Sequence, residues 1–153
     1  MNRIVRAGLA LALGSPMVFA VGCGSSGGKA SLADRIERDR QGSLGELGQM
    51  LRIRKADANK PPAKVTDLAK YEPGFPGGFQ KVWRGEIVLM LGASVEDGAS
   101  ETILAFEKRA PEDGGYVLMQ DGTTIEKLTA DEFRAATKAP GTPTGEQARG
   151  KKG

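Results

Sequence analysis

The sequence predicts an α+β domain, with N-terminal helices packed on a three- to four-stranded antiparallel sheet and a short C-terminal helix. Apolar residues recur at helical spacing up to about residue 83, and short apolar runs bounded by turn residues follow. An Asp-Gly pair at residues 121–122 lies between two of these runs, where it predicts a hairpin. Helices followed by strands are typical of α+β folds, and 153 residues allow one modest domain, which we place at residues 31–137.

The predicted helical half begins with two helices. Ser31 can cap the first one, which carries Leu32 and Ile36 on one face. Three glycines then recur at every third position, namely Gly42, Gly45 and Gly48. Because each glycine costs up to about 1 kcal/mol inside a helix, we expect a break near Gly42 and a second helix over residues 43–55.

A proline-containing loop and an aromatic segment follow the helices. Residues 56–64 are predicted to form the loop, and residues 66–72 a short helical turn that ends before a proline. Phe75, Phe79 and Trp83 are then four residues apart, as in one or two turns of helix. Aromatic residues at this spacing are more often core residues, and the alternative is an exposed surface on which a ligand or partner docks.

The second half of the domain has the pattern of an antiparallel meander. Four segments are rich in apolar or β-branched residues: 86–91, 103–106, 116–119 and 123–128. The Asp-Gly turn predicts that the last two of these pair as a hairpin. Thr129 then has the position of a helix cap, with Phe133 facing inward. Residues 138–153 are dominated by Pro, Gly, Thr and Lys, and we expect them to be disordered.

The first 23 residues have the three-part build of a secretory signal. Arg3 and Arg6 form a positive start, and a mostly apolar stretch leads to Cys23, the only cysteine in the chain. The stretch is short for a membrane-spanning helix and is interrupted by Gly and Pro. An ordinary cleaved signal with an unrelated cysteine is one interpretation of this pattern.

Residues 20–23, Ala-Val-Gly-Cys, resemble the lipobox of bacterial lipoproteins. The resemblance implies that residues 1–22 are a lipoprotein signal peptide and that Cys23 becomes a lipidated N-terminus. Residues 23–30 are rich in Gly and Ser, as expected of a flexible tether. The expected location is therefore the cell envelope, with a lipid anchor in the membrane and the domain facing the periplasm. In such lipoproteins, an Asp directly after the lipidated cysteine holds the protein at the inner membrane. This chain has Gly24 at that position, which favours the outer membrane.

Residues 103–133, ILAFEKRAPEDGGYVLMQDGTTIEKLTADEF, carry a second resemblance. They are similar to the C-terminal part of small uncharacterised bacterial exported proteins, many of them lipoproteins, with the pattern LAYEK-x-P-x-x-GG-x-VL-x-x-DG-[ST]-V-x-x-[ML]T-x-x-EF. Phe106 stands where that pattern has Tyr. The Asp-Gly hairpin and the helix-then-sheet order are also similar to type II secretion pseudopilins and prepilin-like proteins. Those proteins keep a long apolar N-terminal helix. In this chain the apolar run belongs to the expected signal peptide, so the resemblance implies the fold but not the formation of a filament.

Charge and missing residue types exclude several kinds of chemistry. The chain has 22 basic and 19 acidic residues, and without Arg3 and Arg6 the balance is 20 to 19, which gives no reason to expect nucleic-acid binding. Histidine is absent, which removes the commonest general base and metal ligand. One cysteine permits neither an intrachain disulfide nor a cysteine-rich zinc site. No phosphate-binding loop or nucleophile motif occurs, so we expect no cofactor and no enzymatic activity.

One acidic loop is a candidate for calcium binding. Glu96, Asp97 and Glu101 lie around Gly98, and carboxylates in a flexible loop suit Ca²⁺, although an ordinary acidic connection between strands is the alternative.

Together these patterns predict a lipid-anchored, non-enzymatic envelope protein that binds or supports another component. The alternative is a pseudopilin-like accessory of a type II secretion apparatus, and Cys23 contacts the membrane in both cases.

Overall fold

The computed structural model of the chain describes residues 31–145. The expected signal peptide, Cys23, the tether up to residue 30 and residues 146–153 of the expected tail lie outside the described residues. In chain order, three helices precede two strands, and a short helix, two further strands, a second short helix and a last strand follow. This arrangement of helices and an antiparallel sheet confirms the α+β class.

Helix α1, Leu32–Ala58, is a single helix of 27 residues. A capping box starts it, because the Ser31 hydroxyl accepts a hydrogen bond from the Asp34 N–H and the Asp34 carboxylate accepts one from the Ser31 N–H, at 3.1 and 3.0 Å. The predicted break near Gly42 is therefore wrong. Buried leucines hold this helix against the rest of the domain, and such tertiary packing outweighs the low helix propensity of the glycines.

Close backbone contacts explain two of the glycines in the helical half. A Cβ at Gly48 would lie 2.4 Å from the carbonyl oxygen of Gly122, in the Asp-Gly hairpin turn. The 3-10 helix η1, Val65–Gly74, leads into helix α2, Pro76–Trp83. Helix α2 packs on α1 at Gly78, where a Cβ would lie only 2.7 Å from the backbone nitrogen of Leu47.

Five strands form the sheet, in the order β4-β3-β2-β1-β5, and every pairing is antiparallel. Their bounds are β1 Ile87–Leu91, β2 Ile103–Glu107, β3 Gly115–Met119, β4 Ile125–Leu128 and β5 Thr142–Pro143. The first four match the predicted segments, and the fifth corrects the expected three to four strands. The expectation of disorder is also wrong for residues 138–145, because β5 lies in them and pairs with Met90 and Leu91 of β1.

The strand register gives the sheet two distinct faces. Tyr116 and Leu118 of β3 face α1, whereas Phe106 of β2 lies on the opposite face. Two short helices follow β2 and β4, namely α3, Ala110–Asp113, and α4, Ala130–Ala135. The ring of Phe133 on α4 packs 4.7 Å from that of Phe106, so α4 covers the second face, and Phe133 is buried as the sequence predicts.

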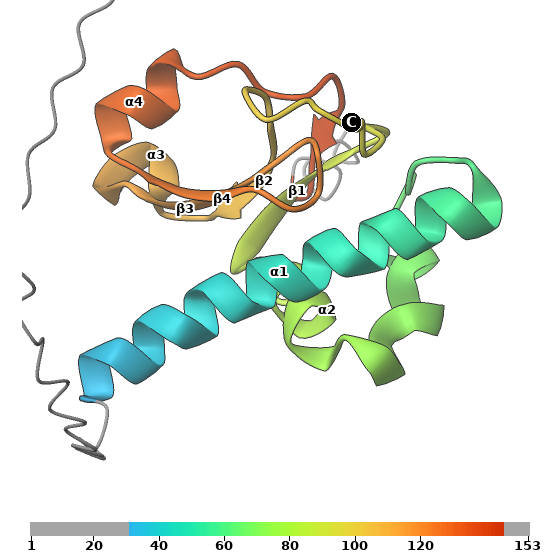
Figure 1. Ribbon diagram of the computed structural model, residues 1–153, viewed down its shortest axis with the longest axis horizontal. Coiled ribbons are helices and arrows are strands. Elements are labelled where there is room, and N and C mark those ends of the chain that lie inside the picture. The colour runs from blue at the N-terminus through green and yellow to red at the C-terminus, as the bar shows by residue number, and fades with distance from the viewer. Residues whose placement is uncertain (1–30, 146–153) are drawn as a thin grey trace, which may run out of the picture.

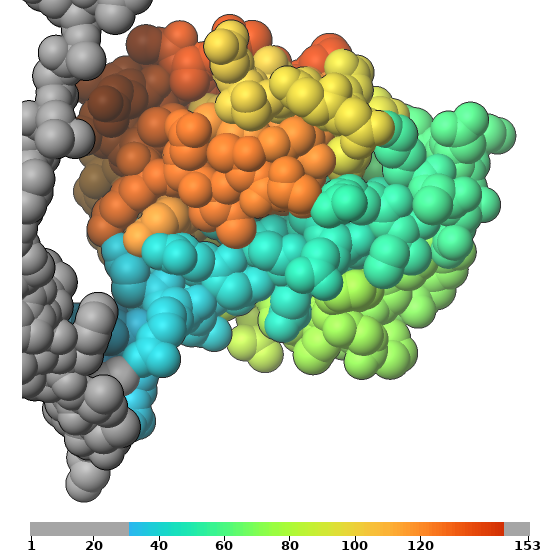
Figure 2. Space-filling model, viewed as in Figure 1, coloured from blue at the N-terminus to red at the C-terminus, as the bar shows by residue number. Residues whose placement is uncertain are grey.

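Figure 1 shows the resulting layers, with α1 crossing the molecule between the strands on one side and α2 and η1 on the other. In Figure 2 the hairpin formed by β3 and β4 (orange) packs directly along α1 (cyan). The core between these layers is apolar, and its fully buried members include Leu44, Leu47, Leu68, Leu89, Leu104 and Leu118. Over residues 31–145, no helix combines the length and the apolar character that crossing a membrane requires.

Candidate functional site

A polar network joins the N-terminal half of α1 to the sheet. The guanidinium of Arg40 donates two hydrogen bonds to the carboxylate of Glu107, from Nε to Oε1 at 2.7 Å and from Nη2 to Oε2 at 2.6 Å. The same carboxylate accepts a hydrogen bond from the backbone N–H of Tyr116 at 2.8 Å. The Glu107 side chain is only 17% exposed. The hydrogen bonds to Glu107 raise the pKa of Arg40, so the guanidinium stays charged and fixes α1 on the sheet.

Glu37, one turn earlier on α1, extends the network to β3 and β4. Its carboxylate accepts hydrogen bonds from Lys127 Nζ and, at 2.7 Å, from the hydroxyl of Tyr116. The amide of Gln41 donates to the same tyrosine oxygen at 2.7 Å. The hydrogen bond from Lys127, followed by that from Tyr116, lowers the pKa of Glu37 from 4.5 to about 2. The pairing with Glu37 in turn raises the pKa of Lys127.

The clear pKa shifts in residues 31–145 all favour the charged form of the group. The pKa is lowered for three acids and raised for three bases: Glu37, Asp121 and Glu132, and Arg40, Lys70 and Lys127. A general acid or base needs the reverse, a pKa tuned toward neutral pH by burial or by like charges. The network around Arg40 therefore has the electrostatics of a structural ion-pair cluster.

A pocket of about 520 Å³ lies beside this network. Four bases and three acids line it: Arg40, Arg84, Lys108, Arg109, Glu86, Glu107 and Asp113. Arg40 is held in the network described above, and Arg109 Nε lies 2.9 Å from a carboxylate oxygen of Asp113. By contrast, Arg84 and Lys108 are exposed and their side chains form no hydrogen bond or ion pair with any described residue. These two cations are therefore available to a ligand.

A more apolar groove of about 650 Å³ adjoins the pocket and shares Arg84, Gly85 and Lys108 with it. We call it the α2–β1 groove, and its other lining residues are Val65, Val82, Trp83, Val88, Phe106, Pro143, Thr144 and Gly145. Trp83, at the end of α2, is 57% exposed, and its ring stacks on that of Phe79 with the centroids 5.9 Å apart. No acidic residue of the described chain lines this groove. It thus presents an apolar surface with two cations that no described residue pairs with.

Only part of the predicted aromatic docking surface is exposed. Phe79 is 4% exposed and belongs to the core, as its helical spacing favours, and Phe75 is half-buried against the core. Of the three aromatic residues, Trp83 alone is open to a partner. The prediction of a docking surface formed by all three aromatic residues is therefore wrong, because the packing of α2 against α1 turns Phe79 inward.

The two cations of the groove were not singled out by the sequence as binding residues. Neither Arg84 nor Lys108 belongs to a sequence pattern that is typical of a binding site. The backbone N–H of Lys108 donates to the carbonyl of Glu86 at 2.9 Å, which brings the start of β1 to the end of β2. Because the strand register decides this neighbourhood, the apolar runs alone could not reveal it.

The acidic loop between β1 and β2 is not arranged as a cation site. Glu96 and Asp97 are exposed, and a carboxylate oxygen of Asp97 lies 3.5 Å from Lys55 Nζ on α1. Within the described residues, no three acidic, histidine or cysteine side chains converge so that they could hold a metal ion. The calcium candidate of Glu96, Asp97 and Glu101 therefore has no support from the structure.

The site must be interpreted from its own geometry. No protein-family model matches the chain, and neither a curated protein nor a solved structure matches it. The surface that offers most to a partner is the α2–β1 groove, because it combines an exposed indole with cations that have no partner in the described residues.

Proposed function

We propose that this chain is a lipid-anchored, non-enzymatic protein of the cell envelope, whose α+β domain binds or supports another envelope component. The observation that carries the proposal is Ala-Val-Gly-Cys at residues 20–23, which follows an apolar run and contains the only cysteine. The thiol at that position is the group that would take a diacylglyceryl chain. Because each buried CH₂ contributes about 0.8 kcal/mol, two or three acyl chains anchor a protein firmly.

The tether keeps the domain close to the membrane. The eight residues 23–30 span at most about 29 Å when fully extended. Ser31, which caps α1, is therefore held within that distance of the lipid headgroups. The domain faces the periplasm, and Gly24 after the lipidated cysteine favours the outer membrane over the inner one.

The electrostatics of the described residues support a binding role rather than catalysis. The clear pKa shifts stabilise charged groups in ion pairs, and the chain has no histidine to act as a general base near neutral pH. The α2–β1 groove instead offers the exposed indole of Trp83 and the guanidinium of Arg84, which belong to residue types enriched at protein interfaces, together with the ammonium of Lys108.

Metabolic labelling with a radioactive fatty acid tests the anchor. The wild-type chain is expected to take the label and sediment with membranes, and Cys23→Ser is expected to take none. Ser25→Ala is the matched control, because it changes a neighbouring small polar residue and keeps the thiol. Label on Cys23→Ser, or wild-type chain recovered with the cytosol, would contradict the proposal.

A second candidate is a pseudopilin-like accessory of a type II secretion apparatus. Its support is the helix-then-antiparallel-sheet order together with the Asp-Gly hairpin between β3 and β4. Crosslinking in intact cells, followed by purification of the chain from membranes and mass spectrometry, distinguishes the two candidates. Secretion components crosslinked to the wild-type chain would favour this second function, and their absence would favour the first.

A further inference from the structure

We propose that the N-terminal end of α1 lies against an anionic lipid surface, with Leu32 and Ile36 at the boundary between the headgroups and the acyl chains. This inference rests on the proposed lipid anchor and deepens it, because it states which face of the domain the anchor brings to the membrane. Three observations carry it: an apolar pair outside the core, two arginines without an acidic partner, and the place where the tether joins the domain.

The first turns of α1 extend past the body of the domain. Residues 31–36 are all exposed, and Glu37 is the first residue of α1 whose side chain bonds the sheet. In Figure 1 this end of the helix (blue) runs past α2 and away from the strands. The capping box at Ser31 nevertheless gives it a regular helical start.

Two apolar side chains on this end stand outside the core. Leu32 is 74% exposed and Ile36 is 51% exposed, and a spacing of four residues places them side by side on one face of the helix. The buried stretch of α1 begins only at Ser43. Single exposed apolar residues are ordinary, but an adjacent pair at the end of a helix indicates that another surface covers it.

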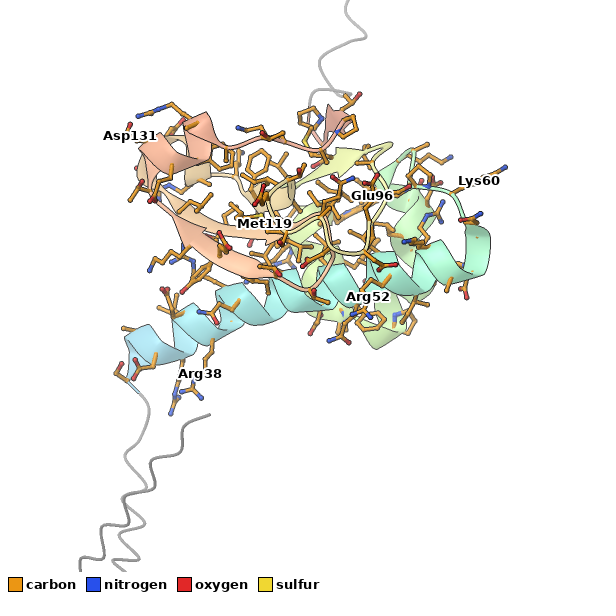
Figure 3. The ribbon with its side chains drawn as sticks, turned by 45° about the horizontal axis from the view of Figure 1, so that its top comes forward. Arg38, Arg52, Lys60, Glu96, Met119 and Asp131 are labelled. Carbon is orange, nitrogen blue, oxygen red and sulfur yellow. The ribbon has the colours of Figure 1, made fainter. Side chains whose placement is uncertain are left out.

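The charges beside this apolar pair are complementary to anionic headgroups. Arg35 lies one turn from Leu32, and Arg38 lies one turn beyond Arg35. Neither guanidinium has an acidic partner among residues 31–145, and Arg38, which projects from α1 away from the strands, bonds only the main-chain carbonyl of Asp34 (Figure 3). The acids of this stretch are already bonded within the domain, namely Asp34, Glu37 and Asp39. An anionic surface therefore meets two arginines without breaking an ion pair.

The tether selects a membrane as the occupant of this face. Residues 23–30 join the domain at Ser31, directly before Leu32, and span at most about 29 Å. Helix α1 alone is about 40 Å long, so the anchor keeps this end of the domain near the headgroups while the other end can lie well above them. A second copy of the chain is the competing occupant, but two apolar side chains are a small part of the about 20–30 residues that each partner contributes to a stable interface.

A helix end of this composition suits the boundary region of a lipid layer. The apolar face of an interfacial helix lies about 5–10 Å into the boundary between headgroups and acyl chains, and long arginine side chains reach back to the headgroups. Each guanidinium can hold a phosphate through two hydrogen bonds. The contact therefore sets the orientation of the domain above the membrane.

Quenching of tryptophan fluorescence by lipids with brominated acyl chains tests the contact. The lipidated full-length chain is reconstituted in vesicles of phosphatidylglycerol and brominated phosphatidylcholine. Trp83 is the only tryptophan, so Trp83→Phe removes the signal, and Ile36→Trp or the exposed position Gln49→Trp then places one reporter on α1. We expect quenching by at least about half at residue 36 and by less than about a tenth at residue 49, which lies about 20 Å further along the helix.

Charge reversal tests the role of the two arginines. Arg35→Glu/Arg38→Glu, added to the reporter at residue 36, should reduce the quenching at least about threefold. Arg52→Glu/Lys60→Glu is the matched control, because it changes the net charge equally toward the opposite end of α1 (Figure 3). With this control the quenching should stay within about a fifth of its original value, because these charges lie more than a Debye length from the surface.

An unquenched reporter at residue 36, equal quenching at residues 36 and 49, or full quenching after Arg35→Glu/Arg38→Glu would overturn the proposal. An unquenched reporter together with a dimer that Leu32→Asp/Ile36→Asp converts to a monomer would assign this face to a second copy of the chain. Flotation of the chain with the vesicles reports the anchor separately. A chain that floats without quenching keeps the anchor and lacks this contact, so the two failures are distinguishable.

Discussion

Substitution by alanine should change the stability of the fold in opposite directions at two glycines of α1. Gly42 and Gly48 lie in one helix, where alanine is favoured over glycine by about 1 kcal/mol. A Cβ at Gly42 meets no atom within 4 Å, whereas a Cβ at Gly48 would lie 2.4 Å from the carbonyl oxygen of Gly122. Gly42→Ala therefore gains the helix propensity in full, and Gly48→Ala must push α1 away from the hairpin turn.

The magnitudes follow from these contacts. Gly42→Ala should raise the free energy of unfolding by about 0.5–1 kcal/mol. For Gly48→Ala the overpacking cost is about 3 kcal/mol, at the upper end of the usual range because the opposing atom belongs to the main chain. Subtracting the helix gain leaves a net loss of about 2 kcal/mol. At roughly 4 °C per kcal/mol, the two melting temperatures should differ by about 10 °C.

Urea and thermal unfolding followed by circular dichroism measure both variants against wild type. Gly45→Ala is the internal control, because its Cβ would lie 3.8 Å from Ile125 Cδ1, an ordinary contact, and it should behave like Gly42→Ala. A loss of stability in Gly42→Ala, or a gain in Gly48→Ala, would refute the inference that close packing, and not weak helix, explains these glycines.

Three further predictions follow from the described contacts. Leu104→Ala removes a fully buried side chain and should cost about 2–5 kcal/mol in urea unfolding, and a loss below about 1 kcal/mol would contradict its place in the core. Thr129→Ala removes the hydroxyl that accepts the Glu132 N–H at the start of α4 and should cost about 1 kcal/mol, whereas Thr129→Ser should cost little. The lowered pKa of Glu37 stabilises the fold fully above pH 4.5, and this contribution is lost as the pH falls toward about 2. Glu37→Gln should therefore flatten the acid limb of the stability profile, and an unchanged limb would show that the bonds from Lys127 and Tyr116 contribute nothing.

The local signals of the sequence predicted much of the fold. The apolar runs placed the first four strands, and the Asp-Gly pair placed the hairpin. Thr129 predicted the cap of α4, and the structure confirms it with a capping box to Glu132. Each of these features depends on residues within a few positions of one another, which is the range over which sequence patterns carry information.

The errors concern features that depend on distant contacts. The three glycines predicted a broken helix, but packing against Gly122 and α2 keeps α1 continuous. The segment Thr142–Pro143 has no strand pattern in its sequence. It is a strand because it pairs with the edge of β1. The groove was missed for the same reason, since pairing of β1 with β2 brings Arg84 and Lys108 to one surface.

The proposed lipid anchor at Cys23 would hold the domain at the membrane. Mass spectrometry of the intact chain extracted from native membranes tests this claim most directly. The predicted result is a mature chain that begins at Cys23 and carries the added mass of a diacylglyceryl group. A chain that begins at Met1 with an unmodified thiol would contradict it.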